Sequence, residues 1–319
     1  NGMLEAIIKS AESVMCLFLV GLVGYVLDRR GWFSPETRKL LPRLVTTVTL
    51  PIYLMTSVIK TFGRDELVHL AYGAAVPGLS FAVVFAAAQL MSLFMARPLG
   101  RTGIFRTGIV ISSTIFTGIP LNIALFGEEA LPYALLYFMA ATVFYWTVGN
   151  YLMSRDGPGP HQPLMSRDTI RRVLSPPILG FFGGVGLILL NWRPPGFVLQ
   201  AAGYVGGLTT PLAIIYIGIS IAGADFRKLS FDRDIIMVLA GRFLVCPLVT
   251  AVLVLLFELP PLMAKVFIIQ SALPVVNSVA LVAGLYGADA EYASVIVSLT
   301  TLVSMVTIPL TMAAMSLFM

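Results

Sequence analysis

Ten long apolar stretches, separated by short charged or Pro/Gly-rich segments, constrain this chain more than any other feature of its sequence. Each is about 20 residues long, which is the length at which an α-helix crosses the hydrocarbon core of a bilayer. We therefore predict ten membrane-spanning helices, at residues 4–27, 40–60, 68–96, 107–127, 129–154, 174–192, 197–223, 234–257, 262–286 and 291–318.

These spans leave too few of the 319 residues for a folded soluble domain. The composition agrees, because 58% of the residues are hydrophobic and 12% are charged, whereas soluble domains are about 45–50% apolar and 25% charged. Two cysteines inside apolar stretches and two distant histidines predict neither a disulfide nor a metal site, and we expect no cofactor.

The distribution of Lys and Arg among the loops predicts the orientation. The loops that follow odd-numbered spans carry fourteen of these cations, and the loops that follow even-numbered spans carry four. Because positively charged loops stay in the cytoplasm, we expect a protein of the cytoplasmic membrane with both termini outside. The net charge of +5 is then an orientation signal and does not indicate nucleic-acid binding.

Two parts of the chain resemble each other at a constant offset of 160 residues. VTTVTLP at 45–51 aligns with VGGLTTP at 205–211, and LFGEEALPYA at 125–134 aligns with LYGADAEYA at 285–293. Chance similarity of apolar segments is the alternative, but Pro and Gly landmarks also match. Because a copied unit of five spans enters the membrane from the opposite side, we predict an inverted repeat of residues 1–154 and 174–319, joined by a cytoplasmic linker at 155–173.

Proline interrupts the fourth span of each predicted repeat. GIPLN at 118–122 contains Pro120, and ALPVVN at 272–277 contains Pro274. Either proline could be an ordinary kink, because proline lacks an N–H group and clashes with the preceding turn. Their matching positions favour two broken helices, whose free N–H groups and positive dipole ends could hold an anion near the membrane centre.

Polar side chains around the two breaks are the candidate substrate-binding residues. They carry hydroxyl or amide groups and form two clusters, Ser113, Thr114, Thr117 and Asn122 with Pro120, and Gln270, Ser271 and Asn277 with Pro274. No acidic residue lies near either break, which disfavours a cationic substrate and tight sodium coupling. Arg242, deep in the eighth span, either contacts the substrate or binds the carbonyls that a broken helix frees, and both alternatives stay open.

Six short motifs follow one another through nearly the whole chain: GIPLNIALFG at 118–127, RRVLSPP at 171–177, GRFLVCP at 241–247, QSALPVVN at 270–277, LYGADAEYAS at 285–294 and TTLVSMVTIP at 300–309. In these motifs the chain resembles the auxin efflux carrier family, which includes the plant PIN proteins and bacterial malate or malonate permeases. The short central loop is similar to that of the bacterial branch. The family commonly has Asn at the position of Ser113, seven residues before Pro120.

The resemblance implies the inverted five-helix fold of bile-acid:sodium symporters, in which helices 4 and 9 are broken and cross at the site. It also implies an elevator mechanism. Helices 3–5 and 8–10 would move as a transport domain against a scaffold of helices 1, 2, 6 and 7, and this scaffold often forms a homodimer.

These observations predict a secondary carrier for a small organic anion, a mono- or dicarboxylate or an auxin-like acid. The alternative within transport is a sodium-coupled symporter of amphipathic acids such as bile acids. An intramembrane enzyme is disfavoured, because GISIAG at 218–223 only approximates the nucleophile motif G-x-S-x-G and no histidine lies deep in a span to act as its base. A seven-helix receptor disagrees with the predicted number of spans.

Overall fold

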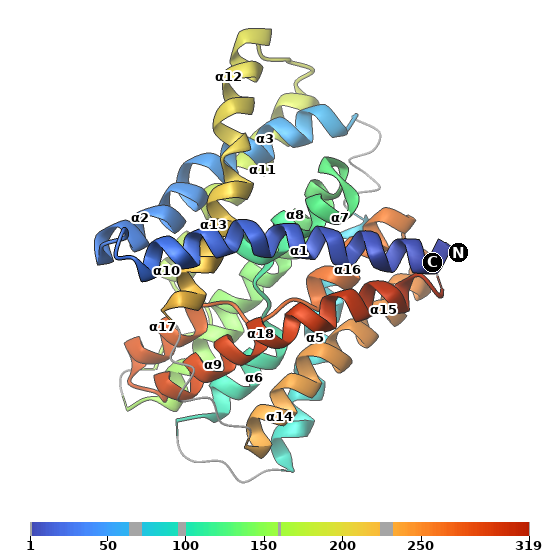
Figure 1. Ribbon diagram of the computed structural model, residues 1–319. Helices are drawn as coiled ribbons and strands as arrows, with labels where there is room; N and C mark the ends of the chain where they lie inside the picture. The colour runs from blue at the N-terminus through green and yellow to red at the C-terminus, as the bar shows by residue number, and fades with distance from the viewer. Residues whose placement is uncertain (1, 64–71, 95–99, 159–160, 224–231, 319) are drawn as a thin grey trace.

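The computed structural model describes residues 2–63, 72–94, 100–158, 161–223 and 232–318, and within these ranges the chain forms helices and no strand (Figure 1). Single long helices form several of the predicted spans: α1 (Gly2–Arg29), α5 (Ala75–Leu93), α11 (Pro176–Leu189) and α18 (Ala290–Met315). Both ends of the helix predicted at 68–96 lie outside the described residues. A short helix, α10 (Arg167–Val173), lies in the predicted linker.

The other predicted spans are built from consecutive helical segments. Three continue through a π-helical turn: α2 (Pro35–Leu44), η1 (Val45–Thr49) and α3 (Leu50–Thr61); η3 (Glu128–Ala130), α8 (Leu131–Phe144), η4 (Tyr145–Gly149) and α9 (Asn150–Asp156); and α14 (Arg233–Ala240), η6 (Gly241–Val245) and α15 (Cys246–Leu256). A fourth joins α12 (Gly196–Gly207) to α13 (Thr209–Ala222). Two are interrupted: α6 (Thr102–Val110) precedes η2 (Thr114–Gly118) and α7 (Ile119–Phe126), and α16 (Pro261–Ser271) precedes α17 (Ser278–Tyr286).

Six helical stretches among the described residues are long and apolar enough to cross a membrane, and the pair α10 and α11, bent by 60°, would make a seventh. The stretches Thr114–Phe126 and Pro261–Ser271 are apolar but shorter. The prediction of an all-helical integral membrane protein is confirmed, with six or seven membrane-spanning helices among the described residues.

A π-helical turn precedes three of the prolines inside these helices. Pro51, Pro120 and Pro247 are each the second residue of the α-helix that follows the five-residue turn. Ahead of Pro120, the Ile119 N–H reaches the Ile115 carbonyl. A proline in the first turn of a helix loses no hydrogen bond. The helix therefore continues through Pro120, and the break predicted at residues 118–122 lies earlier, between α6 and η2.

Glycine allows two pairs of helices to approach closely. In the pair α1 and α13, a Cβ atom at Gly218 would overlap the carbonyl oxygen of Gly21, and in the pair α3 and α11 a Cβ atom at Gly180 would overlap the carbonyl oxygen of Pro51. Thr209 of α13 also donates a hydrogen bond to Thr49 at the end of η1, at 3.0 Å between the hydroxyl oxygens. Buried contacts thus join α1, α3, α11 and α13.

A second set of contacts joins α5, α8, α15 and α16. The ring of Tyr137 lies 5.1 Å from that of Phe81 and 6.0 Å from that of Phe267, and all three side chains are buried. The hydroxyl groups of Ser80 and Thr250 form a buried hydrogen bond of 2.8 Å. Helices far apart in the sequence therefore share this core.

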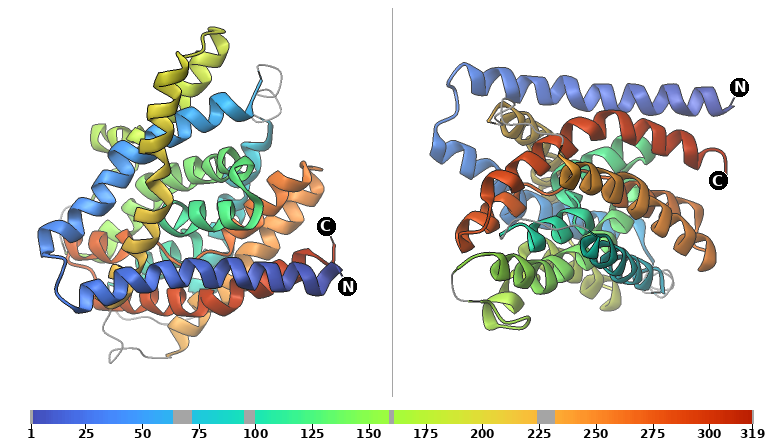
Figure 2. Two further views of the ribbon diagram at one scale, coloured as in Figure 1. Left: turned by 45° about the horizontal axis from the view of Figure 1, so that its top comes forward. Right: turned by 90° about the horizontal axis from the view of Figure 1, so that it is seen from below.

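The views of the whole molecule show how these groups of helices are arranged. Helix α12, with the adjoining parts of α11 and α3, projects away from the rest of the protein (Figure 1). Helix α1 runs alongside α18, and the two ends of the chain lie close together (Figure 2).

Candidate substrate-binding site

The two interrupted helices meet at their breaks. Residues 111–113 link α6 to η2. Ile111 is extended, and Ser112 forms an isolated antiparallel bridge with Val275 in the segment between α16 and α17. The Ser113 N–H donates to the Pro274 carbonyl at 2.8 Å. The second break thus lies where it was predicted, at residues 272–277, and the first lies at residues 111–113.

Side chains satisfy the backbone groups at this crossing. The Ser112 hydroxyl donates to the Gln270 carbonyl at 2.9 Å. The Val275 N–H donates to the Thr300 hydroxyl of α18 at 3.1 Å. Since unpaired backbone groups are costly inside a membrane protein, these bonds make the interrupted geometry stable.

Arg242 of η6 connects the C-terminal ends of α6 and α16, the helices that precede the two breaks. Its fully buried guanidinium donates from Nη1 to the Ile109 carbonyl at 2.7 Å, and from Nη2 to the Ser271 carbonyl. These carbonyls belong to the last turns of α6 and α16, where helix dipoles are negative. Arg242 does not line the cavities described below, and its contacts match the structural alternative raised by the sequence.

A small polar cavity of about 40 Å³ lies beside the crossing. Its polar lining residues are Ser113, Thr117, Ser220, Asn277, Ser298 and Thr301, and no Lys, Arg, His, Asp or Glu is among the residues that line it. Within it, the Thr117 hydroxyl donates to the Ser113 hydroxyl at 3.2 Å, and the Asn277 amide donates to the Ser220 hydroxyl at 3.1 Å. The cavity thus offers hydroxyl and amide groups without a formal charge.

Two of the lining residues stand at the starts of helices. Ser113 precedes η2 and Asn277 precedes α17, and neither side chain caps its own helix. A side-chain oxygen at this position commonly binds the N–H groups of the first turn. Backbone carbonyls of Ser112 and Val276 accept the Thr114 and Val279 N–H groups, at 2.9 and 3.1 Å, so only the remaining N–H groups in the first turns of η2 and α17 are left for a ligand in the cavity.

The remaining candidate residues occupy other places. Thr114 lines the vestibule described below and Pro120 lines an apolar groove, while Asn122, Gln270 and Ser271 are fully buried outside all three hollows. Their side-chain donors bind backbone carbonyls, those of Gly118, Ala134 and Ile268 respectively. Helical periodicity does not distinguish the cavity from the packed core beside it, which is why the sequence grouped these residues together.

The sequence did not identify Ser220, Ser298 and Thr301 as site residues. Ser220 comes from α13, and Ser298 and Thr301 come from α18. The spacing of Ser298 and Thr301 places both on one face of a helix. That face could have been noticed, but only the packing of α18 beside the breaks brings it to the cavity.

Two larger hollows adjoin the cavity. A vestibule of about 630 Å³ shares Ser113, Phe116 and Asn277 with it, and extends to Pro42, Trp146 and Pro176. An apolar groove of about 390 Å³ between α1, α13 and α18 shares Thr117 and Thr301 with the cavity. The polar cavity therefore lies between an open vestibule and an apolar groove.

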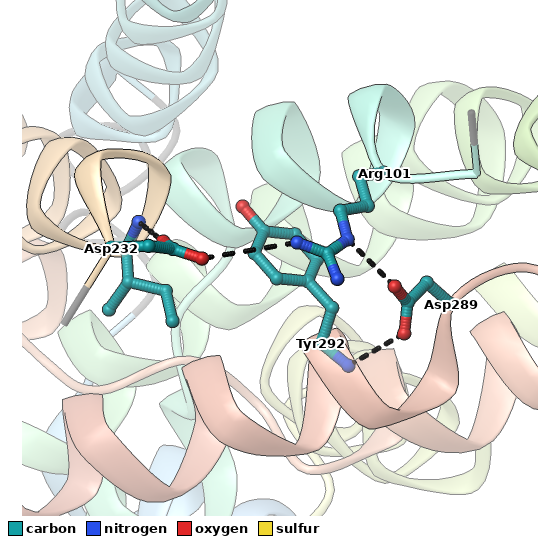
Figure 3. A network of polar contacts seen from close by, with 5 residues as sticks. Arg101, Asp232, Asp289 and Tyr292 are labelled. Carbon is teal, nitrogen blue, oxygen red and sulfur yellow. Dashed lines mark hydrogen bonds and ion pairs between the residues drawn. The ribbon is translucent and has the colours of Figure 1, made fainter. Parts of the chain in front are cut away.

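Outside the cavity, one cation connects three helix ends (Figure 3). Arg101 Nε donates to the Asp289 carboxylate at 2.7 Å, its Nη1 lies 3.9 Å from Asp232, and its guanidinium lies 4.6 Å from the ring centroid of Tyr292. Asp232 and Asp289 also cap α14 and α18, because they accept the N–H groups of Ile235 and Tyr292. We call Arg101, Asp232, Asp289 and Tyr292 the Arg101 cluster; it joins the first turns of α6, α14 and α18.

An all-helical membrane fold with an uncharged polar cavity at two crossing helix breaks defines a membrane transport protein for a small molecule. The chain belongs to the family described as "Membrane transport protein", the auxin efflux carrier family, whose model matches residues 9–312. The resemblance seen in the six motifs is confirmed. The family and its relatives are transporters, so the chain is a transporter and not an enzyme.

Individual relatives agree with this assignment over nearly their whole length. The chain is 26% identical over 306 residues to an uncharacterized transporter of Methanothermobacter thermautotrophicus, a match that covers 94% of this chain and 97% of the relative. It is 23% identical over 299 residues to a Rhizobium meliloti protein named as a candidate malonate transporter, with 92% of each chain covered.

Proposed function

We propose that this protein is a secondary carrier for a small organic anion, a mono- or dicarboxylate or an auxin-like acid. One observation carries the proposal: the cavity lies at the starts of η2 and α17 and is lined by hydroxyl and amide groups without an acidic side chain. Helix N-termini bind anions through free N–H groups and the positive end of the dipole. The name of the Rhizobium meliloti relative supports a carboxylate as substrate.

The proposal includes ten spans arranged as two inverted repeats, residues 1–154 and 174–319 with a linker at 155–173. Support comes from pairs of residues 160 positions apart. Thr49 and Thr209 are hydrogen-bonded to each other, and Gly127 and Gly287 both end a helix with a positive φ, of 84° and 70°. The packing is also reciprocal, because α1 contacts α13 as α11 contacts α3.

The buried contacts between helices fall into two groups, and this division supports an elevator mechanism. Buried contacts join α1, α3, α11 and α13, which correspond to the scaffold helices 1, 2, 6 and 7. The core of α5, α8, α15 and α16 and the Arg101 cluster hold together helices 3–5 and 8–10. These contacts support a transport domain that moves as one body against a scaffold, and homodimerisation through the scaffold is part of the same proposal.

The predicted orientation, with both termini outside the cytoplasmic membrane, can be tested by cysteine labelling. In a protein without its two native cysteines, a membrane-impermeant maleimide should label L317C in intact cells and should label W32C only after lysis. Both side chains are exposed, at 66% and 71%. The reverse pattern would invert the topology.

Transport by the purified protein in proteoliposomes tests the function. A radiolabelled panel of malate, malonate, other carboxylates and indole-3-acetate should include at least one anion that wild type accumulates. Asn277→Ala and Ser113→Ala should reduce its uptake strongly, because both side chains line the cavity, whereas Ser294→Ala, on an exposed part of α18, should not. Wild-type uptake that persists unchanged in both cavity variants would reject this site.

The second candidate is a sodium-coupled carrier of amphipathic acids. It is favoured by the apolar groove, which shares Thr117 and Thr301 with the polar cavity and could receive an apolar body attached to a bound carboxylate. Loss of uptake when choline replaces sodium, with bile-acid-like substrates preferred over malonate, would select this alternative.

A further inference from the structure

The vestibule contains one formal charge. Among the residues that line it, Arg172 is the only Lys, Arg, His, Asp or Glu. The other lining residues are apolar, aromatic or hydroxyl-bearing, including Tyr145, Trp146 and Ser175, apart from the amide of Asn277. A ligand that passes through the vestibule toward Ser113 and Asn277 thus meets a single cation on its way.

The position of Arg172 is defined by its local structure. It lies in the last turn of α10, whose start is fixed where the Ser166 hydroxyl accepts the Thr169 N–H at 3.0 Å. The guanidinium lies 4.5 Å from the ring centroid of Trp146, which itself lines the vestibule. Such cation–π contacts orient an arginine while leaving its N–H donors free at the edges.

No carboxylate in the described part of the chain lies within ion-pair distance of Arg172. An arginine without an acidic partner retains its full attraction for an external anion. The effect is larger in a cleft than on an open surface, because low-dielectric walls such as Trp146 and Phe138 concentrate the field of a charge.

We propose that Arg172 forms an initial anion-binding subsite in the vestibule, where a substrate carboxylate binds before it moves to the polar cavity. This inference rests on the proposed function as an organic-anion carrier. Pro42, Arg172 and Ser175 of the vestibule lining lie beside the loops predicted to be cytoplasmic, so the subsite serves substrate that arrives from that side. It raises the local concentration of anions at the entrance and leaves the geometry of the cavity unchanged.

The test compares Arg172→Gln with Arg171→Gln. The two arginines are neighbours with exposed side chains, but Arg171 does not line the vestibule, so it controls for a general loss of positive charge. Initial rates are measured in inside-out vesicles with the anion that wild type transports. In Arg172→Gln the half-saturating concentration should rise by about 3- to 10-fold at low ionic strength, with little change in the maximal rate.

Three further measurements make the test more specific: the salt concentration, the orientation of the vesicles and a lysine variant. The difference between Arg172→Gln and wild type should shrink toward none as salt rises, because exposed charges are screened. Arg172→Lys, which keeps the charge, should restore most of the affinity, and right-side-out vesicles should show little effect. Equal behaviour of Arg172→Gln and Arg171→Gln, or an effect independent of salt, would overturn the inference.

A lipid phosphate is the other source of an anion for Arg172. Vesicles made of phosphatidylcholine alone and vesicles that also contain phosphatidylglycerol separate the two sources. A defect that persists in phosphatidylcholine supports the substrate subsite, whereas a defect seen only with the anionic lipid means that Arg172 holds a headgroup and overturns the inference. If wild type transports no organic anion, the proposed function is wrong. If wild type transports one and Arg172→Gln has the same half-saturating concentration as wild type, only this inference is wrong.

Discussion

Thr209 donates a hydrogen bond to Thr49 at 3.0 Å, and these two residues are 160 positions apart in the chain. The same offset aligns VTTVTLP at 45–51 with VGGLTTP at 205–211. Equivalent residues of two copies related by a twofold axis can touch each other only close to that axis. We therefore interpret this bond as the place where a pseudo-twofold axis between the proposed repeats passes through the protein.

Replacing either threonine with valine should destabilise the protein modestly. Thr49→Val and Thr209→Val each remove a buried hydroxyl of the pair, at a cost of about 1 kcal/mol. Because both variants lose the same bond, the double variant should cost less than the sum of the two. Thermal unfolding in detergent measures the three values. Additive effects would mean that the threonines do not interact.

Close packing of α1 on α13 predicts a strong effect at Gly218. Gly218→Ala would force Cβ into the Gly21 carbonyl, which is backbone and cannot rotate away, so a loss of at least about 1–3 kcal/mol is expected. Gly203→Ala in α12 is the control, since nothing lies within 4 Å of its Cβ position and alanine favours a helix. Equal unfolding temperatures for the two variants would contradict the packing.

Arg242 variants separate its two possible roles. Arg242→Met would leave the Ser271 carbonyl buried without its donor, at a cost of about 1–3 kcal/mol, and would leave the Ile109 carbonyl with only the weaker Cys246 thiol donor. We expect a lower unfolding temperature in detergent, whereas Arg193→Met, in the exposed segment between α11 and α12, should be neutral. Normal stability combined with a selective loss of substrate affinity would instead assign Arg242 to substrate binding.

The Arg101 cluster predicts a stability change at low pH. Burial disfavours ionisation of Asp289, but the Tyr292 N–H and the Arg101 guanidinium outweigh it, so the pKa of Asp289 lies below its usual value. A carboxyl group whose pKa is depressed by folding contributes stability above its unfolded pKa of about 3.9, and this contribution is lost as pH falls through the lower, folded value.

Asp289→Asn should therefore lower the unfolding temperature at pH 7 and have a smaller effect at the lowest pH at which wild type stays folded. Asp168→Asn, in the exposed first turn of α10, is the matched control. A difference between Asp289→Asn and wild type that is constant over this pH range would show that ionisation of Asp289 does not stabilise the cluster.

Hydrophobic patterning predicted where helices lie, and the position of Pro274 predicted the second break at residues 272–277. It misplaced the first break because Pro120 was expected to interrupt the helix. A π-helical turn at Thr114–Gly118 precedes Pro120 and places it in the first turn of α7, where its missing N–H is not needed. The chain leaves the helix earlier, at residues 111–113, where the sequence contains neither Pro nor Gly.

The binding-site prediction succeeded where residues adjoin the observed breaks and was incomplete elsewhere. Ser113 and Asn277 stand directly at the two helix starts and line the cavity. Asn122 lies two turns further along and is packed in the core, while Ser298 comes from a helix with no break nearby. Whether such a residue lines the cavity depends on which face each helix presents to its neighbours in the packed fold, and the local sequence does not determine that face.

The link that Arg242 makes between α6 and α16 bears on which part of the site would move in the proposed elevator mechanism. One guanidinium joins both interrupted helices, so Ser113 and Asn277 would travel together and keep their distance from each other. Ser220 lies on α13 of the proposed scaffold and would stay behind. The hydrogen bond from Asn277 to Ser220 would therefore break and form again in each transport cycle.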